Sequence, residues 1–538
     1  MGYTIGVSTG LFKIAHSQNP GKSLEFMGLP RKAIWSIYKG VRFAQIDLES
    51  ISEFLEDKLE EKMKKVKAMG IEFGVHGEVP EYAGRLVPFL DTAEEDVYKR
   101  SHDRLIVSAK NCAKIGSKYY LLHSSASRSW YELFAHLGPS QMVDIWGRRF
   151  DKLLAEENKD ILDWAVEQDF IKEIMSRSYT PVSELTKKVL KESIDKHVME
   201  NQDQKITKEQ LEKMKKEAEE KAREIFKESL LDAVSSTGIH YGMERLAFFI
   251  IAKWMQEGKK CPSELKAIWK GITSSGRIED TKFRERAENW VPAVTAAYTW
   301  GHFNPEECPT KEDRLEDPKP YFDDNKMWMA FETPMAGAGT EETSRLAQPI
   351  HIYHMVKNLG TKNAVIVLDF EHQLSSNIDP MKQAEAFPEG EAKWVRLVHV
   401  GYPALLAPAH LPIPLGSDAQ EYIYKLLWEY RKKGFKDGII IFERGGGEEP
   451  IQETVLALKK VVEFLEKDVP PDKLYEHPDF FGLKHMGPEL IRQRTSIKAH
   501  LLDPLKGMLS IPEEEYDFLG TSAAAARKLE EWKKEQYK

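Results

Sequence analysis

The sequence is poor in cysteine and has no excess of basic residues. Cys112, Cys261 and Cys308 are the only cysteines, and they lie far apart without CxxC spacing. This scarcity excludes a disulfide framework and a thiolate zinc finger, and it is typical of a protein from a reducing compartment. The net charge of −9 argues against a generally basic nucleic-acid-binding protein, although a local basic groove stays open.

Long apolar runs are also missing. No stretch of about 18 apolar residues occurs, so we expect no membrane span. The first residues, MGYTIGVSTGLFKI, lack the basic and long apolar regions of a secretory signal peptide, and we therefore expect a cytoplasmic protein. With 41% hydrophobic and 30% charged residues, the chain can still bury a sizeable core.

Eight short apolar runs recur along the chain, each followed by a turn and a segment of helical periodicity. They are residues 4–9, 42–48, 71–76, 118–123, 327–332, 363–369, 394–399 and 438–443. Nearly continuous apolar runs are typical of strands covered on both faces, as in a parallel sheet. Eight such units with right-handed crossovers close most simply into a (β/α)₈ (TIM) barrel. An open doubly wound sheet is the alternative, but no GxGxxG motif follows the first strand.

The connection between the fourth and fifth strands is far longer than the others, and its pattern is mainly helical. Its highly charged run, residues 187–234, suits solvated helices, with a helical hairpin as one arrangement. We predict four segments: a first barrel half (1–129), a helical insertion (130–326), a second barrel half (327–470) and a C-terminal helical extension (471–538). The sequence does not indicate an oligomeric state.

Six consecutive strands end in residue types that bind metal ions. These residues are His76, His123, Glu332, Asp369, His399 and Glu443. Because barrel active sites occupy the C-terminal ends of the strands, these side chains should converge on one rim. A single histidine or glutamate there would more often be a hydrogen-bonding or ion-pairing residue. Six uncompensated polar groups together would be costly, so the set predicts a divalent-metal site.

Two further histidines fit the same rim. His372 follows Asp369 by three residues, and His410 lies in the loop after the seventh strand. Imidazoles and carboxylates suit Zn²⁺ best, with Mn²⁺ or Fe²⁺ as other choices, and these ligands could hold about two or three ions.

These segments resemble the xylose-isomerase-like barrels and, within them, the endonuclease IV family of apurinic/apyrimidinic endonucleases. The similar pieces are AFETPMAGAGT around Glu332, VLDFEHQ around Asp369, and LVHVG, AHLPIPLG and IIIFE between His399 and Glu443. The resemblance covers the two barrel halves and implies a zinc site of three ions. The first ion would be held by His76, His123 and Glu332, the second by Glu332, Asp369, His399 and Glu443, and the third by His372 and His410.

This sequence departs from that family at two places. Where the family has Asp-x-His, the residue preceding His410 by two is Pro408, which cannot bind a metal. The second strand is followed by DLESISEFL and not by a basic and aromatic loop that could enter a DNA groove.

Two functions are compatible with the predicted site. The resemblance to endonuclease IV implies a hydrolase that cleaves a phosphodiester, with abasic DNA as one candidate, through a metal-activated hydroxide oriented by Glu332. Arg128 and Arg444, together with Arg148 and Arg149, are candidate contacts to the phosphate-containing partner.

The alternative is a metal-dependent sugar isomerase or epimerase. Glu332 and Glu443 would act as the acid–base pair, Asp369 and His399 would complete the ligands of one ion, and His372 would contact a sugar hydroxyl. That reaction does not require the histidines at the ends of the third and fourth strands, so the sequence favours the hydrolase. In the insertion, His240 and His302 are expected to belong to its own core.

Overall fold

A computed structural model describes most of the chain. The described residues are 2–10, 28–38, 40–78, 88–125, 142–149, 152, 159–176, 179–200, 205–235, 243–274, 287–334, 346–402, 411–443 and 451–483. The predicted site residues Arg128, His410 and Arg444 lie outside them, as do Pro408 and His240, which was expected in the core of the insertion.

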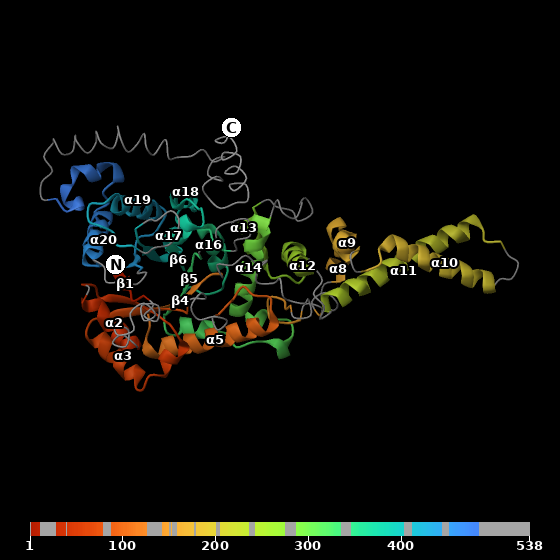
Figure 1. Cartoon of the computed structure of the whole chain (residues 1–538), viewed down its shortest axis with the longest axis horizontal. Helices are drawn as coiled ribbons and strands as arrows, with labels where there is room; N and C mark the ends of the chain where they lie inside the picture. The colour runs from red at the N-terminus through yellow and green to blue at the C-terminus, as the bar shows by residue number, and fades with distance from the viewer. Residues whose placement is uncertain are drawn as a thin grey trace, which may run out of the picture. The chain divides into compact units, whose positions relative to one another are not determined.

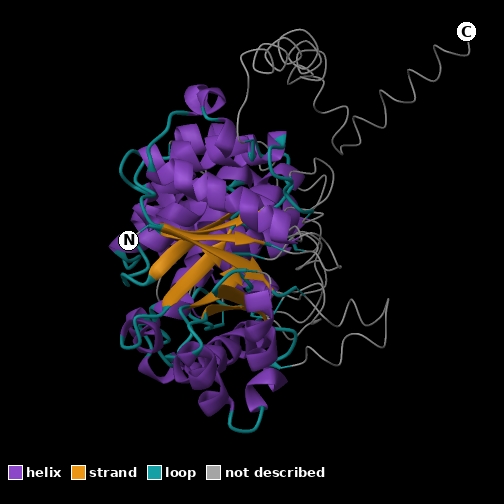
Figure 2. Ribbon diagram, turned by 90° about the vertical axis from the view of Figure 1, so that its left-hand side faces the viewer, coloured by secondary structure: helices purple, strands orange, loops and turns teal. Residues whose placement is uncertain are grey.

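Eight parallel strands form a closed barrel in the order of the sequence, as predicted (Figure 2, orange). They are β1 (Tyr3–Ser8), β2 (Phe43–Asp47), β3 (Glu72–His76), β4 (Tyr119–His123), β5 (Trp328–Glu332), β6 (Ala364–Asp369), β7 (Val395–Val400) and β8 (Gly438–Phe442). Each boundary agrees with the predicted run to within one residue. The (β/α)₈ prediction is therefore confirmed, and the open sheet is excluded.

Helices follow the strands as in other barrels of this kind (Figure 1). They are α2 (Leu29–Tyr38), η2 (Ile51–Leu55), α3 (Leu59–Ala68), α5 (Glu95–Ile115), α15 (Lys319–Asp323), α16 (Pro349–Lys357), α17 (Phe370–Ser375), α18 (Pro380–Ala386), η10 (Ala392–Trp394), α19 (Asp418–Lys432), α20 (Ile451–Glu466), η11 (Pro471–Glu476) and η12 (Pro478–Phe481). Local sequence signals mark where these helices begin and end. In α19, Ser417 accepts a hydrogen bond from the backbone of Gln420, and acidic residues in the first turn and basic ones in the last complement the helix dipole.

The chain divides into two compact units. One comprises residues 1–90, 101–129 and 316–538 and contains the barrel, and the other comprises residues 91–100 and 130–315. The second unit is helical, with α8 (Lys159–Glu167), α9 (Asp169–Ser176), α10 (Val182–Glu200), α11 (Lys208–Ser235), α12 (Met243–Glu257), α13 (Ser263–Thr273), α14 (Ala287–Phe303), η7 (Pro305–Glu307) and η8 (Lys311–Asp313). The charged run forms α10 and α11, which pack against each other. The four predicted segment boundaries stay predictions. Within the described residues, no helix is both long and apolar enough to cross a membrane.

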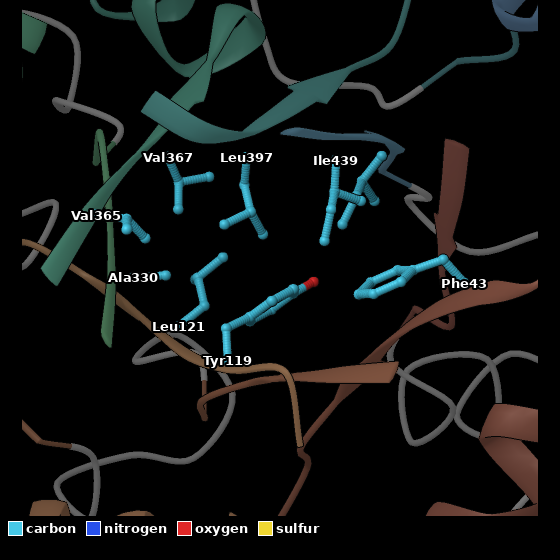
Figure 3. Packing of buried hydrophobic residues seen from close by; sticks show 9 residues of the cluster. Phe43, Tyr119, Leu121, Ala330, Val365, Val367, Leu397 and Ile439 are labelled. Carbon is cyan, nitrogen blue, oxygen red and sulfur yellow. The ribbon is translucent and has the colours of Figure 1, made fainter. Parts of the chain in front are cut away.

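The inward faces of the strands fill the barrel with apolar side chains. The cluster consists of Phe43, Tyr119, Leu121, Ala330, Val365, Val367, Leu397, Ile439 and Ile441, and Figure 3 shows these side chains converging. Because side chains alternate along a strand, the residue two positions beyond a core residue faces inward as well. Leu121 is thus followed by His123, and Leu397 by His399. The same periodicity builds the core and then aims the polar strand ends at the barrel axis.

A glycine makes room for the largest side chain of this core. A Cβ atom at Gly74 would lie 2.2 Å from two ring atoms of Tyr119, which is far inside van der Waals contact. Because Gly74 has no side chain, the Tyr119 ring can occupy the barrel interior next to β3. Its hydroxyl group donates a hydrogen bond to Oε1 of Gln45 at 2.9 Å.

Gly74→Ala should destabilise the barrel by about 1–3 kcal/mol, because the added methyl group overpacks a rigid interior. Urea denaturation followed by tyrosine and tryptophan signals would measure the loss. The matched control is the same change in a Tyr119→Leu background, where the clash is relieved and the cost should shrink. An equal cost in both backgrounds would contradict this packing.

Candidate metal centre

The carboxylate of Glu332, at the end of β5, lies at the centre of the rim cluster and is fully buried. Its Oε2 atom is 3.3 Å from Nε2 of His76 and 3.4 Å from Nε2 of His123. Its Oε1 atom is 2.9 Å from Nδ1 of His399 and 3.5 Å from Nδ1 of His372. One carboxylate thus contacts imidazoles from β3, β4, β7 and α17.

Two more carboxylates approach the imidazole of His399. Its Nδ1 atom lies 3.1 Å from Oε2 of Glu443 and 3.6 Å from Oδ2 of Asp369, in addition to its contact with Glu332. Two ligand atoms on one ion, each at about 2.1 Å, are separated by about 3–3.5 Å, so this spacing would allow a metal ion to bind these atoms.

The donors fall into two groups that share Glu332. One group is His76, His123 and Glu332, and the other is Glu332, Asp369, His372 and Glu443. Within each group the ligand atoms lie within 4.8 Å of one another.

Backbone contacts orient two of the imidazoles. Nδ1 of His76 is 2.7 Å from the carbonyl oxygen of Gly77, so the ring donates there and directs Nε2 at Glu332. Nδ1 of His372 is 3.0 Å from the carbonyl oxygen of Thr333. The Asp369 side chain caps α17 by accepting the backbone N–H of His372 at 2.7 Å, which ties the end of β6 to the first turn of α17. Such contacts to ligand residues are the usual support of a metal site.

Charge coupling inside the cluster shifts its protonation. Burial alone would raise the pKa of Glu332, but the positive charges of His399 and His123 outweigh burial and hold it well below its ordinary range. Burial alone would lower the pKa of His76, but Glu332 outweighs it and raises that pKa to about 9. The pKa of His372 also rises to about 9, because Asp369 and Glu332 outweigh burial.

The donor set fits a divalent cation. Oε2 of Glu332 is buried and makes no hydrogen bond within the described part of the chain, although two imidazole nitrogens lie nearby. A buried carboxylate oxygen left in this way is costly unless a proton or a cation compensates it. Carboxylate oxygens and imidazole nitrogens are suitable ligands for Mn²⁺, Fe²⁺ or Zn²⁺.

Other predicted site residues lie elsewhere or cannot be placed. The proposed third-ion ligand His410 and the proposed phosphate contacts Arg128 and Arg444 fall outside the described residues. Arg148 is buried in the helical unit, where its guanidinium binds the Asp144 carboxylate at 2.7 Å. His302 is buried in the same unit and stacks on Tyr98 with ring centroids 3.9 Å apart.

Two buried residues next to the cluster, Asp47 and Gln45, were missed in the sequence. Asp47 ends β2 as His76 ends β3, and the two are paired in register. Gln45 lies one inward position earlier and contacts both Tyr119 and His399. The predicted second run extended to Leu48, one residue beyond the end of β2, so its last residue was apolar and Asp47 was not selected.

No protein-family model matches the chain, and no curated protein sequence matches it. Similar solved structures include a D-tagatose 3-epimerase-like protein, with 10% identity, a TM-score of 0.39 and coverage of 87% of this chain and 100% of that one. An L-ribulose 3-epimerase has 8% identity and a TM-score of 0.37, covering 87% of this chain and 98% of its own. A D-psicose 3-epimerase solved in the presence of D-fructose has 10% identity and a TM-score of 0.35, covering 88% of this chain and 98% of its own.

All three neighbours are named as sugar epimerases or epimerase-like proteins, and none is named as an endonuclease. The predicted phosphate-ester hydrolase is wrong on this comparison, since the structures named are sugar epimerases and none is a phosphodiesterase. The physical reason lies in His76 and His123, which had favoured hydrolysis. Both rings lie against the buried Oε2 of Glu332, and compensating that charge is a role that any reaction at this site could use. A phosphate-containing partner, DNA included, stays a prediction.

Metal binding should compete with protons at this centre. Raised histidine pKa values stabilise the metal-free fold fully below the ordinary value of 6.5, and this contribution is lost as the pH rises through about 9. A metal ligand must be deprotonated, so binding strengthens over the same range. Excess MnCl₂ should therefore raise the melting temperature more at about pH 8.5 than at about pH 6.5. A larger rise at the lower pH would contradict these shifts.

Proposed function

We propose that the protein is a metal-dependent sugar isomerase or epimerase. The observation that supports this most is the pair of glutamates flanking one imidazole nitrogen. Glu332 lies 2.9 Å and Glu443 3.1 Å from Nδ1 of His399, at the ends of β5 and just beyond β8. Two carboxylates on either side of a bound substrate are what proton removal and return at a carbon beside a carbonyl require.

The two glutamates differ in their environments. Glu332 has no exposed side-chain surface, and the imidazoles around it hold its pKa low, so it is ionised at neutral pH. The Glu443 side chain keeps 16% of its surface exposed, so a substrate entering the rim can reach it. One carboxylate would take the proton from the sugar carbon, and the other would return a proton to that carbon or to its neighbour.

In this proposal the principal ion would be held by Glu332, Asp369 and Glu443, the carboxylates of one donor group. His399 would replace His372 as the imidazole ligand, because its Nδ1 atom lies within 3.6 Å of all three carboxylates. When bound, the ion would polarise the sugar carbonyl and stabilise the charge that develops on its oxygen. Three of these four donors are carboxylate oxygens, which favours Mn²⁺ over the zinc expected from the sequence. His372, anchored on the Thr333 carbonyl, would orient a sugar hydroxyl group.

Deuterium exchange tests the proposed reaction. The Mn²⁺-loaded protein, incubated in D₂O with a panel of ketohexoses and ketopentoses, should incorporate deuterium at the carbon beside the carbonyl of its substrate. Glu332→Gln and Glu443→Gln should each reduce exchange by at least about 10³-fold while the far-UV circular dichroism is unchanged. Chelation should abolish exchange, and added Mn²⁺ should restore it. A fully active Glu332→Gln variant would refute the mechanism.

The ligand assignment predicts different effects for two buried histidines. His399→Ala should weaken the tightest Mn²⁺ binding by at least about tenfold, because it removes a donor of the principal ion. His76→Ala is the matched control, since it removes another imidazole that contacts Glu332 but no proposed ligand of the ion, and it should weaken that affinity less than His399→Ala does. Isothermal titration would measure both. A greater loss in His76→Ala would place the principal ion on the other side of Glu332.

A further inference from the structure

Gln45 contacts the imidazole of His399 on the side opposite the three carboxylates. Gln45 is fully buried on the inward face of β2, while His399 projects from β7 across the interior. Oε1 of Gln45 lies 2.9 Å from Nε2 of His399. The same oxygen accepts the hydroxyl hydrogen of Tyr119 at 2.9 Å.

A glutamine amide can face an imidazole with its oxygen or with its NH₂ group, and its other neighbours determine which. Here the neighbour is Asp47, whose Oδ1 atom lies 3.4 Å from Nε2 of Gln45. A carboxylate oxygen only accepts hydrogen bonds, so the amide must turn its NH₂ group toward Asp47. Its oxygen is then left facing His399.

Asp47 is itself held in place. Its Oδ2 atom accepts the backbone N–H of Gly10 at 2.5 Å and the hydroxyl group of Thr9 at 3.3 Å. Its backbone N–H donates to the hydroxyl oxygen of Thr9 at 3.0 Å. The chain of hydrogen bonds therefore has a defined direction, from the imidazole to the amide and from the amide to a fixed carboxylate.

From this arrangement, we infer that Gln45, oriented by Asp47, is a positioning residue that sets which nitrogen of His399 binds metal. Both ring nitrogens of His399 face an oxygen at 2.9 Å, Gln45 Oε1 at Nε2 and Glu332 Oε1 at Nδ1, so both carry a hydrogen in the charged ring. When the ring loses one proton, the neutral amide oxygen of Gln45 holds the remaining hydrogen on Nε2. In the neutral ring the lone pair is then on Nδ1, the atom that faces Glu332, Glu443 and Asp369. This inference rests on the metal ligands assigned in the proposed function.

The Asp47→Asn variant tests the direction of this chain most sharply. An asparagine has one oxygen, and the backbone N–H of Gly10 requires it at the Oδ2 position. The NH₂ group of Asn would then face Gln45, whose amide must turn over and present NH₂ to His399. The imidazole would accept at Nε2 and carry its hydrogen on Nδ1, where it blocks metal binding.

Binding of MnCl₂ to the full chain by isothermal titration should fall about 10–100-fold in Asp47→Asn, as is typical when support of a metal-binding histidine is lost. Gln45→Met, which removes the acceptor and keeps the side-chain length, should show a loss of similar size. Tyr119→Phe is the matched control. It removes the other donor to the same Oε1 atom without turning the amide, and its loss should stay below about threefold.

The Co²⁺-loaded proteins provide a readout that mere destabilisation would not reproduce. Loss of the imidazole nitrogen should move the visible absorption bands of Asp47→Asn to longer wavelength, while Tyr119→Phe keeps the wild-type spectrum. If Gln45→Met fails to fold, Asp47→Asn alone decides. Wild-type affinity and spectrum in a folded Asp47→Asn variant would overturn the inference and leave the proposed function standing. A wild-type chain that binds neither Mn²⁺ nor Co²⁺ would overturn both.

Discussion

The buried negative charge of Glu332 is the constraint on which the rim of this barrel depends. A carboxylate with no exposed surface is tolerated only when positive charge surrounds it, and four imidazoles do so here. In the proposed function, one of these imidazoles, His399, would also bind the principal ion once it has released a proton. Protons on the imidazoles and a bound cation are then alternative ways of compensating the charge of Glu332.

The alternation of side chains along each strand links this polar cluster to the apolar core of the barrel. The inward positions that fill the barrel with Leu121, Leu397 and Ile441 continue, two residues later, as His123, His399 and Glu443. The apolar layer below excludes water from the polar layer above. Gly74 contributes to this arrangement, because the space beside it lets the Tyr119 hydroxyl group reach Gln45 from within the core.

The sequence predicted the fold well because its signal is local. Apolar runs such as 363–369 mark buried strands directly, and a barrel is the simplest closure of eight of them. The residue types at six strand ends were visible for the same reason. Gln45 escaped notice because its role arises from His399, which lies 354 residues away in the chain. The two residues come into contact only when the barrel closes.

The reaction was harder to infer than the site. Histidines at positions 76 and 123 suggested a multi-ion hydrolase, although imidazoles against a buried carboxylate do not specify a reaction. The proposed isomerase or epimerase reaction rests instead on the placement of Glu332 and Glu443 about Nδ1 of His399. That placement depends on distances across strands β5, β7 and β8, which the sequence does not contain.

Diffraction from crystals grown with Mn²⁺, recorded where manganese scatters anomalously, would locate the ion. We expect an anomalous peak bounded by the carboxylates of Glu332, Asp369 and Glu443 and by Nδ1 of His399, with Nε2 of that ring still bonded to Gln45. A strongest peak between His76 and His123, or no peak at the rim, would contradict this expectation.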